Sequence, residues 1–425
     1  MKYETAFVFD ASTVKFGPDI TEEVGHDMKC LGSKHVMVIT DQSLTDSQAV
    51  SVVLEALRKE DVDFALFDQT RIEPTDKSFK EAAEFAVNGR FDGFVGVGGG
   101  SSIDTAKAAN LYSTYPADFL AYVSPPIGKG QPVPGRLRPM IAVPTTAGTG
   151  SETTGLAIFD LEAMHVKTAV AHRFLRPALG VIDPNNTRTL PRMVAACTGF
   201  DVLTHALESF TAIPYDHRPA PENPGLRPSY QGSNPISDIW ASEAIKTVSR
   251  NLPRVLQDPN DDIARAQMLL AATFAGIGFG GAGTHLAHAM SYPVSGMVRS
   301  YIPEGYPRDH PLIPHGMAVV LNAPAVFRFT APARPERHLE AARLMGADTS
   351  SSSLRSAGEV LVGRIVELIR LAGIPNGLKA VGFGPEDLEV LVTGAFAQQR
   401  LTKLSPRLVD EADFRQLFLD SMTCW

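Results

Sequence analysis

The sequence predicts an α/β domain followed by an all-α domain. The chain has 425 residues, which is more than one ordinary domain holds, so two domains are the default. Up to residue 186, short apolar runs alternate with helical patterns, which is typical of a parallel sheet with helices on both faces. After that point, long helical patterns follow one another. We therefore predict domains at 1–186 and 187–425.

The first domain is predicted to consist of strands separated by helices. Short apolar runs, rich in β-branched residues, predict buried strands at 34–40, 63–67, 93–97 and 138–143. The intervening patterns predict helices at 48–59, 78–88 and 103–109. A last apolar run at 179–184 closes this half of the chain.

Two loops in this half have the composition of ligand loops. The run Gly98-Gly99-Gly100-Ser101-Ser102 separates a strand from a helix, where glycines allow close approach and free helix N–H groups attract a phosphate. A tight turn explains one glycine but not three, so we favour a phosphate site, although the GxGxxG pattern is absent. The loop at 144–152 is either a flexible linker or a ligand loop, since it directly follows a strand.

Asp41 ends the strand at 34–40. At the carboxyl end of a parallel strand, its carboxylate could accept hydrogen bonds from a ribose. A role as a cap for the following helix is an equally weighted alternative.

The second domain is read as helical. Apolar periodicity predicts helices at 190–212, 238–255, 261–278, 354–372 and 385–398. Two proline-rich stretches, 211–236 and 293–316, interrupt the pattern, and we expect their prolines to exclude helix interior. Loops of this length inside a compact domain are often functional.

Asp201 and His205 stand one turn apart on the same face of the helix at 190–212. A carboxylate and an imidazole at this spacing can reach one metal ion. For the pair alone, a surface pair or a core hydrogen bond is the favoured interpretation. His285, His288 and His315 add imidazoles in apolar surroundings, and together these residues favour a site.

Composition excludes several functions. The net charge is −8 without a basic block, which argues against nucleic acid and an anionic membrane as partners. The three cysteines are far apart and lack CxxC spacing, which fits a reducing compartment. The first residues resemble neither a signal peptide nor a transit peptide, and we see no apolar run near the ~20 residues that span a bilayer. We expect a soluble cytoplasmic protein.

Several stretches resemble the iron-containing (group III) alcohol dehydrogenases along essentially the whole chain. The family motifs are GVGGGSSIDTAKAANLY (96–112), PTTAGTGSETT (144–154), GFDVLTHALES (199–209), HLAHAMSYPVSG (285–296) and IPHGM (313–317). Further stretches resemble the hydroxyacid–oxoacid transhydrogenase branch of that family, at 71–86, 122–130, 230–241, 309–327 and 335–348.

The resemblance implies a Rossmann-like dinucleotide-binding domain and a helical metal-binding domain, as in dehydroquinate synthase-like proteins, with the site in the cleft between them. The implied catalytic and metal-binding residues are Asp201, His205, His288 and His315. These ligand types suit several divalent metals, and we expect Fe²⁺ first and Zn²⁺ second. His285 would lie outside the ligand set, in a supporting or structural role. Tyr292 occupies a position where many alcohol dehydrogenases of the family have a second histidine, which argues against a histidine proton relay there.

The resemblance also implies bound NAD and a homo-oligomer, a dimer. The implied NAD-binding residues are Asp41, Gly99, Gly100, Ser101, Asp104, Thr145, Thr146, Thr149 and Lys167. An acidic residue at position 41 would repel a 2′-phosphate, so NAD is favoured over NADP.

The implied reaction is hydride transfer between a small hydroxyacid, or an alcohol, and NAD. The metal would act as a Lewis acid on the substrate oxygen, and a bound NADH would pass its hydride to an incoming 2-oxoacid. The branch is associated with oxidation of 4-hydroxybutyrate to succinate semialdehyde and reduction of 2-oxoglutarate to 2-hydroxyglutarate. Arg299, Arg308 and Lys129 are candidate cations for these carboxylates, although for any one of them a solvated loop charge is the favoured interpretation.

Two alternatives stay open. An ordinary NAD-dependent alcohol dehydrogenase of the same family would release NADH after each turnover. A non-catalytic NAD-binding module would need no metal, and the four filled ligand positions argue against it.

Overall fold

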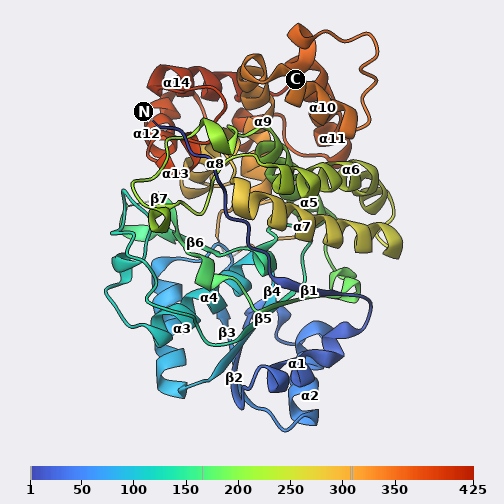
Figure 1. Cartoon of the computed structure of the whole chain (residues 1–425). Coiled ribbons are helices and arrows are strands. Elements are labelled where there is room, and N and C mark those ends of the chain that lie inside the picture. The colour runs from blue at the N-terminus through green and yellow to red at the C-terminus, as the bar shows by residue number, and fades with distance from the viewer. Residues whose placement is uncertain (1, 165, 307, 309) are drawn as a thin grey trace. The chain divides into compact units, whose positions relative to one another are not determined.

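The computed structural model describes residues 2–164, 166–306, 308 and 310–425 (Figure 1). The chain divides into two compact units, one formed by residues 10–190 and the other by residues 1–9 with 191–425. The N-terminal residues join the second unit through Glu4. Its carboxylate accepts a hydrogen bond from Arg227, and its backbone N–H donates to the carbonyl of Arg218. The sequence prediction placed this N-terminal segment in the first domain, 1–186, and not with the helical unit.

The first unit contains a six-stranded parallel sheet in the order β1-β8-β5-β4-β2-β3, which confirms the predicted α/β class. Its strands are β1 (Thr13–Phe16), β2 (His35–Asp41), β3 (Asp63–Thr70), β4 (Gly93–Gly98), β5 (Met140–Pro144) and β8 (Leu179–Ile182). A separate antiparallel pair consists of β6 (Leu156–Leu161) and β7 (Val166–Ala171). The short edge strand β1 and this pair were not predicted from the sequence.

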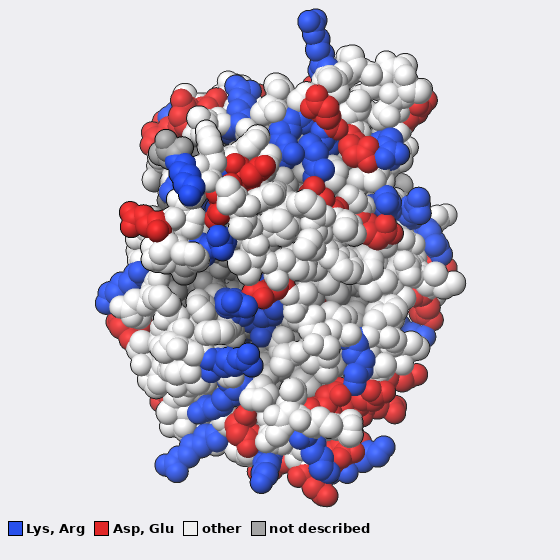
Figure 2. Space-filling view, viewed as in Figure 1, with Lys and Arg blue, Asp and Glu red and all other residues white. Residues whose placement is uncertain are grey.

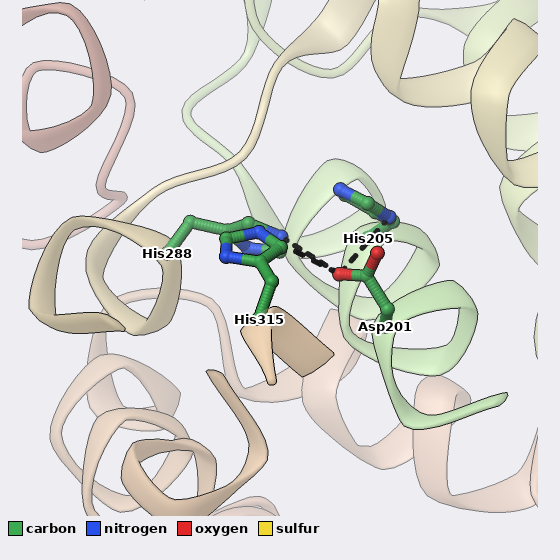
Figure 3. Close-up of side chains that lie close together, drawn as sticks. All are labelled: Asp201, His205, His288 and His315. Atoms are coloured by element: carbon green, nitrogen blue, oxygen red, sulfur yellow. Dashed lines mark ion pairs between the residues drawn. The ribbon is translucent and has the colours of Figure 1, made fainter. Parts of the chain in front are cut away.

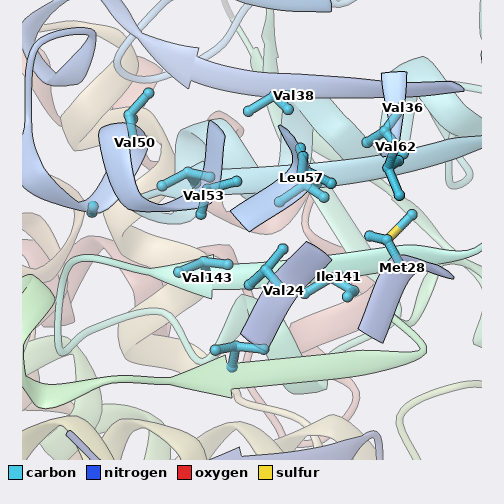
Figure 4. Packing of buried hydrophobic residues seen from close by; sticks show 14 of the residues in the cluster. Val24, Met28, Val36, Val38, Val50, Val53, Leu57, Val62, Ile141 and Val143 are labelled. Carbon is cyan, nitrogen blue, oxygen red and sulfur yellow. The ribbon is translucent and has the colours of Figure 1, made fainter. Parts of the chain in front are cut away.

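Helices cover both faces of the parallel sheet. On one face, α1 (Val24–Cys30) and α2 (Gln48–Lys59) pack on buried valines and one isoleucine contributed by β2, β4 and β5 (Figure 4). On the other face, α3 (Asp76–Gly89) and α4 (Gly100–Thr114) pack on Met37, Ile39 and Phe94. Burial on both faces explains why the central strands read as continuous apolar runs.

The chain leaves β2 and β4 toward opposite faces of the sheet. The loop after β2 leads to α2, and the loop after the neighbouring strand β4 leads to α4. In open parallel sheets, ligands bind at the carboxyl ends of strands where the connections diverge in this way. The loop after β5 lies beside the same point, because Gly98 of β4 is paired with Pro144 of β5.

The second unit is helical, as predicted. Its helices are α5 (Arg192–Thr211), α6 (Pro235–Gln257), α7 (Asp262–Ala282), α8 (Leu286–Gly296), α9 (His315–Thr330), α10 (Pro335–Leu344), α11 (Ala357–Ala372), α12 (Leu388–Phe396), α13 (Gln399–Thr402) and α14 (Glu411–Asp420). Helix α5 packs against α6, α7 and α9 and is buried on all sides from Gly199 to Thr211. A polar side chain on α5 therefore faces the interior of the unit.

Several helices differ from the sequence prediction. The predicted helices at 190–212, 238–255, 261–278 and 354–372 correspond to α5, α6, α7 and α11, whereas 385–398 contains only the shorter α12. Helices α8, α9, α10, α13 and α14 were not predicted. The expectation that prolines exclude helix interior across 293–316 is wrong at Pro293, which lies inside α8. Packing of α8 against α9 and α12 offsets the backbone hydrogen bond that this proline cannot make.

Helix α7 is long and apolar enough to cross a membrane, judged by length and composition alone. Its most apolar window has a mean hydropathy of 1.3, and 67% of that window is buried inside the structure. The expectation that no apolar run approaches this length is therefore corrected. Core helices of soluble proteins have the same properties, and α7 packs against α5 and α6.

Acidic and basic side chains are interspersed over the face shown in Figure 2. Charged side chains elsewhere in the described residues form surface ion pairs, such as Lys77 with Glu162 at 2.6 Å and Lys29 with Glu60 at 3.0 Å. Exposed pairs of this kind contribute little to stability, roughly 0–1 kcal/mol each. The architecture therefore rests on the buried apolar clusters.

Candidate functional site

Four side chains from three helices meet inside the helical unit (Figure 3). They are Asp201 and His205 from α5, His288 from α8 and His315 from the start of α9, and one ligand atom of each lies within 4.8 Å of the others. Oδ1 of Asp201 lies 3.6 Å from Nδ1 of His205, 3.7 Å from Nε2 of His288 and 3.8 Å from Nε2 of His315. The structure thus brings together all four residues that the resemblance implied.

The close approach of α9 to α5 depends on a glycine. A Cβ atom at Gly316 would lie 2.0 Å from the carbonyl oxygen of Cys197, a separation that no side chain tolerates. Gly316 therefore lets the first turn of α9 rest on α5, and this places His315 beside Asp201. On α5 itself, helical periodicity places Asp201 and His205 on one face.

Three polar atoms in this cluster are buried without a hydrogen-bond partner in the described part of the chain. They are Oδ1 of Asp201, Nδ1 of His205 and Nε2 of His288. Leaving such atoms unpaired costs free energy, so native proteins rarely do so without a ligand. Separations of 3.6–3.8 Å are too long for hydrogen bonds. They suit atoms that share one ion, because metal–ligand distances are about 2.0–2.2 Å.

The electrostatics of Asp201 and His205 also fit a cation, whereas the carboxylates of Glu208 and Asp201 raise the pKa of His288 to about 9. Burial alone would raise the pKa of Asp201, but the imidazoles of His205, His315 and His288 hold it well below its usual range. Burial lowers the pKa of His205 to about 3, against the opposing pull of Asp201. An ionised carboxylate and a neutral imidazole are the protonation states that a divalent metal requires.

Glu208 contacts His288 at Nδ1, the ring nitrogen that faces away from Asp201. Its carboxylate is buried, and one oxygen lies 2.5 Å from Nδ1 of His288. It also accepts the backbone N–H groups of His285 at 3.0 Å and Ala287 at 2.6 Å, at the start of α8. A carboxylate in this position fixes the ring so that Nε2 faces Asp201. Our sequence analysis did not identify this role, although Glu208 lies one turn after His205 on the same face of α5.

His285 lies outside the four-residue cluster. Its Nδ1 is 3.0 Å from Glu208, and its Nε2 is 3.1 Å from the hydroxyl of Thr211. This is a supporting position, as the sequence suggested. Tyr292 lies one turn beyond His288, with its ring centroid 6.1 Å from that of His315, so a phenol occupies this place beside the cluster.

Most of the predicted NAD-binding residues stand at the carboxyl ends of β2, β4 and β5. Asp41 ends β2, Gly99 and Gly100 begin α4 after β4, and Thr145, Thr146 and Thr149 follow β5. A Cβ atom at Gly100 would lie 2.5 Å from the side chain of Thr149, so only glycine allows these two loops to meet. Asp41 accepts a hydrogen bond from the N–H of Ser43 at 3.0 Å, so the cap is formed.

The other three predicted NAD-binding residues are engaged within their own unit. The hydroxyl of Ser101 accepts the backbone N–H of Glu73 at 3.2 Å. Asp104 accepts hydrogen bonds from the hydroxyl of Ser151 at 2.5 Å and from the N–H of Ile158 at 2.9 Å. The Lys167 ammonium lies 2.8 Å from Glu73 and 3.0 Å from Asp160, and the side chain is 1% exposed. Their contact with NAD stays a prediction.

The three candidate cations for a substrate carboxylate differ in their surroundings. Arg299 is ion-paired with Asp387, so its charge is already compensated. Arg308 is exposed and stands between two residues, 307 and 309, that lie outside the described part of the chain. Lys129 is exposed on the α/β unit.

Comparison with known proteins agrees with this architecture. Residues 11–184 match the model of the iron-containing alcohol dehydrogenase family, and residues 229–422 match its C-terminal domain. The hydroxyacid-oxoacid transhydrogenase of Xenopus tropicalis is 52% identical over 423 residues, covering 99% of this chain and 91% of the relative. The protein of the same name from Homo sapiens is 52% identical, covering 98% and 90%. The solved structure of an alcohol dehydrogenase from Oenococcus oeni is 28% identical in sequence, with a TM-score of 0.85, covering 98% of this chain and 100% of that one.

The expected cytoplasmic location is contradicted by these relatives. The Xenopus tropicalis and Homo sapiens proteins are both named as mitochondrial. Our expectation rested partly on the cysteines, which are free at positions 30, 197 and 424. Free cysteines indicate reducing surroundings and do not distinguish one such compartment from another.

The two family domains cover most of the chain, and the identity to the transhydrogenases extends over nearly its full length. The parallel sheet and the helical unit with its Asp–His cluster are the two parts that the motifs implied. The chain therefore belongs to the iron-containing alcohol dehydrogenase family, in the hydroxyacid–oxoacid transhydrogenase branch, and is a metal- and NAD-dependent oxidoreductase.

Proposed function

We propose that this protein transfers a hydride from 4-hydroxybutyrate to 2-oxoglutarate through one bound NAD, giving succinate semialdehyde and 2-hydroxyglutarate. The single observation that carries the proposal is the cluster of Asp201, His205, His288 and His315, with buried polar atoms left unpaired and facing one another. It occurs in a chain that is 52% identical to proteins named for this reaction class.

We propose that these four residues hold the catalytic metal, with Fe²⁺ favoured and Zn²⁺ as the alternative. Such an ion, when bound, acts as a Lewis acid toward the substrate oxygen. The protein's part is to keep Asp201 ionised, to keep His205 unprotonated and to fix the orientation of the His288 ring through Glu208.

We propose that residues 10–190 form the NAD-binding domain and that the helical unit is the metal-binding domain. Gly99, Gly100 and Ser101, at the N-terminus of α4, would bind the pyrophosphate through backbone N–H groups. Asp41 would bind the ribose. Asp104 and Lys167 also hold the surrounding loops, because their charged groups are paired within the unit, and their contact with NAD stays part of the proposal.

A transhydrogenase needs only one nucleotide, which is reduced by the first acid and reoxidised by the second. The protein must therefore retain the nucleotide while the acids exchange. An ordinary dehydrogenase of the same family would instead release NADH, and this is the alternative function that the experiment must separate.

The test is to purify the protein, measure its bound metal and nucleotide, and assay both acids together without added NAD. We expect 2-hydroxyglutarate to form at a rate that rises with 2-oxoglutarate, without free NADH in solution. A requirement for stoichiometric soluble NAD, together with indifference to 2-oxoacids, would identify an ordinary dehydrogenase. Light scattering on the same sample tests the proposed homodimer.

A further inference from the structure

A half-buried arginine in the helical unit has one buried guanidinium nitrogen and no acidic partner in the described part of the chain. Arg400 lies in α13, and its Nη1 is buried without a hydrogen-bond partner among the described residues. No carboxylate among the described residues forms an ion pair with Arg400. Buried charges in proteins are normally paired, because desolvating an isolated charge is costly. An unpaired guanidinium donor is thus a candidate position for an anionic ligand.

Two tyrosines hold Arg400 in place. Its Nη2 donates a hydrogen bond to the hydroxyl of Tyr292 at 3.3 Å. Its guanidinium lies 5.0 Å from the ring centroid of Tyr230, which is within the range of a cation–π contact. Neither contact neutralises the charge, so the cation is positioned and uncompensated.

Both tyrosines connect Arg400 with the metal cluster. The ring of Tyr292 lies 6.1 Å from that of His315. The ring of Tyr230 lies 6.4 Å from that of Phe279, which in turn stacks on His205 at 4.0 Å. Helix α13 also packs against α8, which carries His288. A cation and the four-residue cluster therefore lie in one contiguous group of side chains.

We propose that Arg400 binds the carboxylate of the substrate that lies farthest from the reacting carbon. This rests on the proposed function, because it requires acidic substrates. An Arg fork matches the two oxygens of a carboxylate, and it forms stronger hydrogen bonds than a neutral donor. Tyr292 orients the fork by holding Nη2, which leaves Nη1 for the ligand.

The chemistry of the two acids explains how one cation serves both. In 4-hydroxybutyrate the carbon that carries the hydroxyl is separated from the carboxyl carbon by three carbon–carbon bonds. In 2-oxoglutarate the keto carbon and the distal carboxyl carbon are separated by the same number of bonds. A single cation at a fixed distance from the cluster therefore recognises both substrates in turn, as an exchange on one bound nucleotide requires.

The other cations are less suited to this role. Arg299 is already paired with Asp387 and its side chain is 57% exposed, so water and the acid compete with a ligand. Lys129 is exposed and belongs to the α/β unit. Arg400, with its buried and unpaired Nη1, is the cation that gains most from a carboxylate.

The test uses glutarate, a dicarboxylate without a hydroxyl or keto group, and measures its binding to the metal-loaded protein by calorimetry. Arg400→Gln removes the charge, and Arg400→Lys keeps the charge but loses the fork. Lys403→Gln is the matched control, because it removes one positive charge from an exposed position three residues away. Metal content is measured for every variant, and the neutral substrate 1,4-butanediol reports on the hydride chemistry.

We expect Arg400→Gln to weaken glutarate binding by about 10- to 100-fold, the range for a lost charged hydrogen bond. The KM for both acids should rise by a similar factor, while turnover of 1,4-butanediol and metal content stay unchanged. Arg400→Lys and Tyr292→Phe should show smaller losses, and Lys403→Gln none.

Unchanged glutarate affinity in Arg400→Gln, or an equal loss for 1,4-butanediol, would overturn the proposal. If Arg400→Gln does not fold, Arg400→Lys and Tyr292→Phe provide the test. Glutarate affinity equal to that of the unaltered protein in both variants would refute the proposal. The proposed function fails separately, if the unaltered protein shows no exchange between the two acids. Glutarate binding that depends on Arg400 would then still stand.

Discussion

The two units each bury a network of charged side chains, and the networks differ in how completely they are paired. In the α/β unit, Lys107 donates hydrogen bonds to the hydroxyl of Ser151 at 2.5 Å and to the carbonyl of Leu156 at 2.7 Å, and it contacts Asp104. In the helical unit, Asp201 and His288 have buried atoms without hydrogen-bond partners in the described part of the chain. Both regions pay the cost of desolvation, but only the first compensates it within the protein. The incompletely paired network is therefore the one that favours a bound ligand.

The same difference separates buried histidines. His338 is fully buried, but both of its ring nitrogens are bonded, one to the carbonyl of Arg334 at 2.8 Å and the other to the hydroxyl of Thr330 at 2.9 Å. In His288 only Nδ1 is bonded, and Nε2 points toward Asp201. Burial alone does not indicate a metal ligand, whereas an unpaired ring nitrogen that faces other ligand atoms supports this role.

The largest predicted effect comes from breaking the unpaired network at His288. His288→Ala should lose its metal and its activity, because the loss of a ligand must exceed the roughly 10- to 100-fold cost of losing an outer partner. The fold should persist, since the other core contacts of α8 remain. Metal analysis, an activity assay and circular dichroism measure the three properties.

His338→Gln is the matched control for a fully paired histidine. It should keep its metal and its turnover, and lose stability by about 1–3 kcal/mol through disturbed buried hydrogen bonds. Retention of full metal occupancy by His288→Ala would show that the proposed ligand set is wrong.

The next effect concerns the two buried carboxylates that support these networks. Glu208→Gln keeps an acceptor for the N–H groups of α8 but loses the charge that holds His288. We expect about 10- to 100-fold weaker metal binding, measured by competition with a chelator. Asp104→Asn should lower the free energy of unfolding without changing metal affinity. If the two variants affected metal binding equally, the distinction between the networks would fail.

Sequence patterns alone predicted the strands of the α/β unit better than the four-residue cluster of the helical unit. The strands β2, β4 and β5 were predictable because burial on both faces gives continuous apolar runs. The metal cluster was recognised as a set only through family motifs, since helical spacing relates Asp201 to His205 but not to His288 or His315, which come from other helices. The β6–β7 pair and helices α8 to α10 were missed, because tertiary packing and not local pattern stabilises them.

Partners of charged residues could not be predicted from the sequence. The family resemblance implies NAD contacts for Asp104 and Lys167, which stay a prediction. Their bonds to Ile158, Glu73 and Asp160 could not be predicted, because they depend on the folding of the β6–β7 pair against α4. Glu208 and Arg400 were overlooked for the same reason. The first contacts α8, the second contacts Tyr230 and Tyr292, and no spacing in the sequence relates these residues.

The fully paired His338 predicts a dependence of stability on pH. Burial lowers its pKa from 6.5 to about 4. Between these values the unfolded chain binds a proton that the native protein does not, so the protein becomes less stable as the pH falls. One such group contributes at most about 1.4 kcal/mol per pH unit. Urea unfolding at pH 7 and pH 5 should show a smaller loss for His338→Gln than for the unaltered protein, and equal losses would contradict the assignment.

The smallest predicted effect concerns Asp41, a single acidic side chain in the α/β unit, in contrast to the cluster of four side chains in the helical unit. The edge of the sheet where we propose that NAD binds offers mainly backbone and hydroxyl groups, and Asp41 is the acidic residue at the end of β2. Its Oδ1 accepts the N–H of Ser43, which fixes the carboxylate at the edge of the sheet. There it would bind a ribose and repel a 2′-phosphate.

Asp41→Ser keeps a capping oxygen but removes the charge, so the preference for NAD over NADP should fall by about 1 kcal/mol, or roughly fivefold. Fluorescence titration with NADH and NADPH measures both affinities. Ser43→Ala, which removes a neighbouring hydroxyl without changing the charge, should leave the preference intact. Equal affinity of the unaltered protein for both nucleotides would show that Asp41 acts only as the cap.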